Sequence, residues 1–143
     1  MSIKARIDDA LFLWKNDRKE GAFLSALVAV ASTSKRLYPK LKDGKAFEQF
    51  LIDSRLMRTS VEYRGELHKI EHIFYKWLRC ELVHEGGLPT DIQFTLSKEP
   101  NMLMLRAGGA PEFVLKLSDS WFHFLVNTVV NAPINSDQFG NAG

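Results

Sequence analysis

Apolar residues in the first half of the chain recur every three or four positions, which is the period of an amphipathic helix. The pattern predicts one helix that ends at Asn16 and Asp17, a second over about residues 20–38, and a third that Asp43 caps. Pro39 ends the second helix, because proline disfavours a helical conformation in the residue before it.

The longest predicted helix covers residues 64–85. Its apolar stripe is formed by Leu67, Ile70, Phe74, Trp77 and Leu78. Gly86 and Gly87 follow, and glycine readily adopts the left-handed conformation that closes a helix. Pro89 then prevents the helix from resuming. This segment is therefore expected to be the most regular helix of the chain.

After this helix the period changes to the alternation of β-strands. Short alternating runs within about residues 91–117 predict a small antiparallel hairpin or sheet, and Ser118 caps a last helix that Pro133 ends. The predicted fold is mainly α: a bundle of four to five helices with a small antiparallel β-hairpin or sheet inserted before the last helix. Residues 1–134 would form this single domain, and residues 135–143 a flexible tail.

Composition is that of a globular protein. The chain has 143 residues, of which 45% are hydrophobic and 25% charged, and this suits one domain with its own core. It contains no apolar run of the roughly 20 residues that span a bilayer, and its first residues lack the apolar stretch of a signal peptide. These features predict a cytoplasmic protein with no membrane partner. The single cysteine, Cys80, excludes an internal disulfide and a cysteine-based zinc site.

A net charge of +2 is too small to identify a nucleic-acid-binding protein by itself. Basic residues are concentrated where the second helix ends, with Asp43 as the nearby acid. The candidate RNA-binding residues are Lys35, Arg36, Lys40 and Lys42. Such a cluster attracts phosphate groups. A solvated basic surface without a partner is the alternative interpretation.

Arg79 and His84 stand at the end of the longest predicted helix. Arginine binds phosphate with a planar fork of donors, and histidine moves protons near neutral pH. Five positions along a straight α-helix leave two side chains about 140° apart, so this pair converges only where the helix tightens or ends. Alternatively, both cations face the negative end of the helix dipole. Glu81 lies between them and could orient either one.

The stretch 75–86 resembles the signature of the HEPN superfamily, in which an arginine is followed four to six residues later by a histidine. The upstream residues 22–39 and 43–51 are also similar to HEPN proteins. The resemblance covers about residues 5–88. It implies a bundle of four or five helices that forms a homodimer, with the motifs of the two copies facing each other.

The resemblance further implies a metal-independent endoribonuclease of the toxin or defence type, without a cofactor. Arg79 would bind and polarise the scissile phosphate, and His84 would move protons around the 2′-hydroxyl and the leaving 5′-oxygen. RNA would be the substrate, and an antitoxin or effector protein a further partner. Cys80 departs from the polar residue, such as asparagine, that many active members carry after the arginine. The alternative is a non-catalytic HEPN-like module that binds a nucleotide or a protein, so enzymatic activity stays open.

His68 and His72 form a second candidate pair, with Glu71 between them. Histidines four positions apart on one helix face can hold a divalent metal ion. Two partly exposed histidines on a charged face are the simpler interpretation, so no metal site is predicted.

Overall fold

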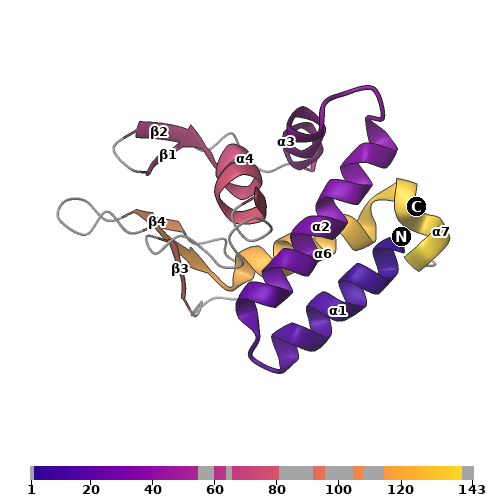
Figure 1. Cartoon of the computed structure of the whole chain (residues 1–143), viewed down its shortest axis with the longest axis horizontal. Helices are drawn as coiled ribbons and strands as arrows, with labels where there is room; N and C mark the ends of the chain where they lie inside the picture. The colour runs from indigo at the N-terminus through magenta and orange to yellow at the C-terminus, as the bar shows by residue number, and fades with distance from the viewer. Residues whose placement is uncertain are drawn as a thin grey trace.

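The computed structural model describes residues 2–54, 60–63, 66–80, 92–95, 105–107 and 115–139, and it is mainly helical (Figure 1). The helices are α1 (Ile3–Lys15), α2 (Lys19–Leu37), α3 (Asp43–Asp53), α4 (Ile70–His72), the π-helix η1 (Ile73–Cys80), α6 (Ser120–Asn131), the 3-10 helix η2 (Pro133–Asn135) and α7 (Ser136–Phe139). The strands are β1 (Ser60–Tyr63), β2 (Glu66–Lys69), β3 (Ile92–Thr95), β4 (Leu105–Ala107) and β5 (Leu115–Ser118). None of the helices in these ranges has the length and apolar character needed to cross a membrane.

The long helix α2 lies at the centre, with α1 alongside it and α6 crossing it (Figure 1). Its buried stripe combines Phe23, Leu27 and Val30 with alanines, and the small alanines let neighbouring helices approach closely. Trp14 of α1 stacks on Phe122 of α6, with ring centroids 4.2 Å apart. The predicted bundle of helices in the first half and at the end of the chain is therefore confirmed.

The prediction of the longest helix is wrong for its N-terminal part. Residues 66–69 form β2, which pairs antiparallel with β1, and Tyr63 stands opposite Glu66 in that hairpin. The helix begins only at Ile70. Leu67, which the helical pattern placed on the apolar stripe, is 76% exposed. Backbone pairing with β1 thus replaces the helical turn that the side-chain period predicted.

The insertion before α6 is a mixed sheet in which β5 is the middle strand. β4 pairs antiparallel with β5, as predicted, whereas β3 pairs parallel with β5. The prediction of an antiparallel hairpin is therefore wrong for β3 and β5. A parallel pair needs a long connection between its strands, and residues 96–114 provide that length. Phe94 of β3 stacks on Phe23 at 4.2 Å and so attaches the sheet to α2.

The prediction of a flexible tail from residue 135 onward is also wrong for residues 135–139. Asn135 is completely buried. Its Nδ2 donates to Thr33 Oγ1 at 2.9 Å and to the Val129 carbonyl at 3.0 Å, while its Oδ1 accepts from Arg36 at 3.1 Å. These bonds attach the segment after α6 to the middle helix of the bundle. Residues 140–143 lie outside the described ranges.

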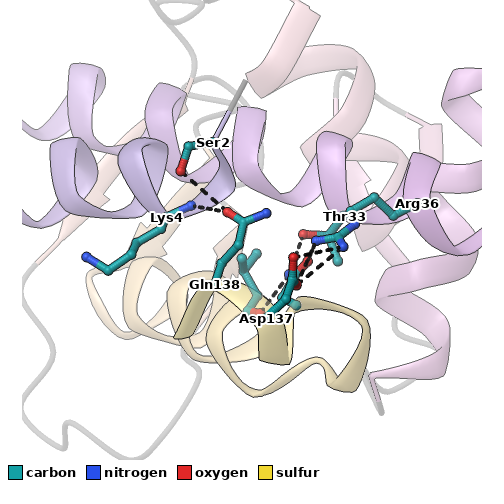
Figure 2. A network of polar contacts seen from close by, with 8 residues as sticks. Ser2, Lys4, Thr33, Arg36, Asp137 and Gln138 are labelled. Atoms are coloured by element: carbon teal, nitrogen blue, oxygen red, sulfur yellow. Dashed lines mark hydrogen bonds and ion pairs between the residues drawn. The ribbon is translucent and has the colours of Figure 1, made fainter. Parts of the chain in front are cut away.

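The short helix α7 closes this network from the outside (Figure 2). Asp137 forms an ion pair with Arg36 at 3.3 Å. The Oε1 of Gln138 accepts a hydrogen bond from the backbone N–H of Lys4 at 2.9 Å. The C-terminal segment therefore holds α1 and α2 together, because it bonds to both.

Candidate functional site

A pocket of about 390 Å³ opens between α2 and η1. The α2 side is a single helix face, with residues at i, i+3, i+4 and i+7. The η1 side carries Tyr75 and Arg79, and Asp43 lies at the start of α3. The described lining is Val28, Ala31, Ser32, Lys35, Asp43, Tyr75 and Arg79. Of the predicted site residues, the structure brings Lys35 and Arg79 together.

η1 is a π-helix, and its residues Tyr75 and Arg79, four positions apart, both line this pocket. The backbone hydrogen bonds of a π-helix join residues five positions apart. π-Helical segments are rare in proteins, and those that occur often lie at functional sites. Residues five positions apart therefore lie close together, and Cys80 contributes to raising the pKa of Tyr75. The same interval separates Arg79 from His84 in the sequence. His84 and Glu81 lie outside the described residues.

Arg79 is partly buried at the end of η1. Its guanidinium carbon lies 5.8 Å from the ring centroid of Tyr75, which is a cation–π distance. Its Nε is buried and has no hydrogen-bond partner among the described residues. A buried donor that lacks an acceptor costs about 1–3 kcal/mol. The described part of the protein therefore does not satisfy all the donors of Arg79.

Lys35 reaches the pocket from α2 and is held there by two contacts. Its Nζ lies 3.2 Å from Oδ1 of Asp43 and donates to the Leu41 carbonyl at 2.8 Å. The Lys35 and Asp43 side chains are 41% and 70% exposed, so water and ligands reach both. A second cation thus stands across the pocket from Arg79, accompanied by one carboxylate.

Tyr75 forms part of the wall between these charges. Its ring packs on Phe47 at 5.3 Å and lies against Gly44, where an added Cβ would come within 3.0 Å of the ring. Burial raises the pKa of the Tyr75 hydroxyl, and Cys80 and Asp43 raise it further, while Arg79 opposes them. The hydroxyl therefore keeps its proton at neutral pH and can donate it in a hydrogen bond to an anion.

The other predicted RNA-binding residues do not line this pocket. Arg36 points to the opposite network, where Asn135 and Asp137 bind its guanidinium. Lys40 and Lys42 are exposed on the turn before α3. The sequence reasoning missed Asp43 and Tyr75 as pocket residues. For Tyr75, the signal was available in its position four residues before Arg79.

The two histidines of the second candidate pair contact each other and nearby carboxylates. The rings of His68 and His72 lie 6.1 Å apart and nearly parallel. His68 faces Glu66 at 3.8 Å, and His72 faces Glu48 at 3.6 Å. Within the described ranges, no three or more His, Cys, Asp or Glu side chains are grouped so that they could hold a metal ion.

A larger hollow of about 950 Å³ lies between the ends of α2 and α3 and the outer face of α6. Its wall contains the aromatic rings of Phe50 and Phe124 and the amides of Asn127 and Asn131. Its described lining includes one carboxylate, Asp53, and no basic side chain. The smaller pocket, with its two cations, is therefore the better candidate for an anionic ligand.

Comparison with known proteins identifies a family. No curated protein and no solved structure matches the chain. The model of the Rv1289 family matches residues 2–143, a range that includes both walls of the pocket. The resemblance to the HEPN superfamily stays a prediction that this match does not test. Because the family model matches nearly the whole length, the chain belongs to the Rv1289 family.

Proposed function

We propose that the chain binds RNA and holds a backbone phosphate in the pocket between α2 and η1. The observation that carries this proposal is Arg79, a cation that lines the pocket and whose guanidinium group is not fully paired among the described residues. A phosphate offers several anionic acceptors, and the arginine fork matches their geometry. Lys35 would supply a second positive charge, and the Tyr75 hydroxyl a neutral donor.

We further propose that the bound RNA is cleaved without a metal ion. In this reaction the 2′-oxygen attacks the phosphorus, a 2′,3′-cyclic phosphate forms, and the 5′-oxygen leaves with a proton. Arg79 would stabilise charge on the phosphoryl oxygens, and His84 would carry protons. The support is the Arg79–His84 spacing and the resemblance to the HEPN superfamily. A homodimer would provide two copies of His84 for the acid and the base.

Binding without cleavage is the second candidate function. One observation favours it: the described lining of the pocket contains two cations, Lys35 and Arg79, which suit the binding of an anion. Tyr75, which also lines it, has a pKa above its ordinary value and so is a poor base at neutral pH. The described part of the pocket can thus hold a phosphate through charge and hydrogen bonds.

Binding is tested first, with a labelled single-stranded RNA in EDTA, by fluorescence anisotropy. Arg79→Gln should weaken binding about tenfold or more, because it removes a charge-assisted hydrogen bond. The matched control is Arg18→Gln, which removes the same charge from an exposed arginine at the opposite end of α2. Equal affinities of the two variants would contradict the proposed phosphate site.

Cleavage is tested on the same RNA by gel electrophoresis and analysis of the product ends. The wild type should release 2′,3′-cyclic phosphate ends in EDTA, and His84→Ala should bind RNA without cleaving it. Binding without cleavage by the folded wild-type protein would reject the nuclease and select the binding module.

A further inference from the structure

We infer that Asp43 adjusts the charge of the pocket and so shifts its preference away from a terminal phosphate and toward an internal phosphodiester. The inference rests on the function proposed above, because it names the phosphate class that the same pocket accepts. Asp43 lines the pocket together with both cations, and its Oδ1 lies 3.2 Å from Lys35 Nζ. It is therefore placed to act on any anion that approaches Lys35.

The charges of the described lining set the preference. Lys35 and Arg79 are the two cations, and Asp43 is the one carboxylate. A phosphodiester carries a single negative charge, which balances the net positive charge of this lining. A terminal phosphate carries a charge of about −2 above its second pKa near 6. The Asp43 carboxylate repels both ligands, and its repulsion is stronger for the doubly charged terminal phosphate.

The exposed surroundings set the size of the effect. Asp43 and Lys35 are both in contact with water, so solvent and salt screen their interaction. Exposed charge pairs of this kind contribute little free energy. We therefore expect Asp43 to change the preference between the two ligands about two- to fivefold. Lys40 and Lys42 lie outside the pocket on the neighbouring turn and attract both ligands.

The test compares two small ligands that a ribonuclease cannot cleave. The dinucleotide d(ApA) contains one phosphodiester and no terminal phosphate, whereas dAMP contains one terminal phosphate. Each competes with the labelled RNA at low salt and at a pH above the second pKa of dAMP. Asp43→Asn should improve the affinity for dAMP relative to d(ApA) about two- to fivefold, since one negative charge is removed beside Lys35.

Asp8→Asn is the matched control. Asp8 is an exposed aspartate in an ion pair with Lys4 at 2.9 Å, on α1 and outside the pocket lining. It should leave the ratio of the two affinities unchanged. Circular dichroism confirms that both variants fold.

The outcomes separate the two claims. A changed ratio in Asp43→Asn alone supports the inference. Displacement of the RNA by both ligands with the same ratio in every variant overturns the role of Asp43 while the phosphate site stands. Failure of the wild type to bind the labelled RNA overturns the proposed function, and the role of Asp43 with it.

Discussion

At the scale of single residues, the Tyr75 ring leaves little room beside Gly44. A Cβ on Gly44 would lie 3.0 Å from Cε2 and 3.3 Å from Cζ of that ring. Alanine favours a helix over glycine by up to about 1 kcal/mol, but crowding a packed site costs about 1–3 kcal/mol. Gly44→Ala should therefore leave the free energy of unfolding unchanged or lower it by up to about 2 kcal/mol in urea denaturation.

Gly21 provides the matched comparison, because it also lies in the first turn of a helix. A Cβ there would meet Leu13 Cδ1 at 3.4 Å, which is an ordinary contact. Gly21→Ala should raise the free energy of unfolding by about 0.5–1 kcal/mol, since only the helix preference changes. If both substitutions stabilised the protein equally, the contact between Gly44 and Tyr75 would have no energetic weight.

Ionisation of the Tyr75 hydroxyl makes the stability of the folded protein depend on pH in the alkaline range. Burial chiefly raises its pKa above the ordinary value of 10.0, so the folded protein holds this proton more tightly than the unfolded chain. The resulting stabilisation is fully present below pH 10.0 and is lost as the pH rises through the folded-state pKa. Relative to Tyr75→Phe, the wild type should lose stability across that interval in urea denaturation. Parallel curves for the two proteins would argue against this titration.

At the scale of elements, the C-terminal segment is held mainly by one buried amide. Asn135→Ala removes two donated hydrogen bonds and one of the acceptors of Arg36, and these bonds are lost at a buried position. We expect the free energy of unfolding to fall by about 1–3 kcal/mol. Asp137→Asn, which weakens only a partly exposed ion pair, should cost less than about 1 kcal/mol. Similar losses in both variants would show that the ion pair matters as much as the amide.

The same scale shows how far the sequence predicts the fold. The spacing of apolar residues correctly predicted α1, α2, α3 and α6, because each of these helices buries a single face. The hairpin of β1 and β2 was missed, since the residues around Leu67 fit a helical stripe and strand pairing depends on a partner that the period does not show. The direction of β3 against β5 was wrong for a related reason: alternation identifies a strand but not its orientation.

The candidate site was predictable in part. Arg79 and Lys35 were found from their residue types and neighbours, and they lie in one pocket. Arg36 looked equivalent to Lys35 in the sequence, but its partner Asp137 lies 101 positions away and draws its side chain elsewhere. A cluster of basic residues along the chain therefore does not show which of them face a common ligand. Contacts between distant segments decide this.

At the scale of the whole molecule, the strength and salt dependence of RNA binding depend on a few cations. The net charge is only +2, so attraction over long distances is weak and the local group near the pocket dominates. For single strands, the logarithm of the binding constant falls with the logarithm of salt concentration by about 0.7 for each phosphate neutralised. If the pocket neutralises one phosphate and Lys40 and Lys42 neutralise one each, the slope should be about −2.

Two variants test how much different cations contribute to this slope. Replacing Lys40 and Lys42 together with alanine should reduce its magnitude by about 1.4, because both are exposed on the turn beside the pocket. Arg36→Gln should leave the slope unchanged, because Asp137 and Asn135 already bind that guanidinium. Anisotropy titrations across a series of salt concentrations measure both slopes. A shallower slope in Arg36→Gln would mean that RNA binds across the whole basic cluster, so the phosphate path would extend beyond the pocket toward α7.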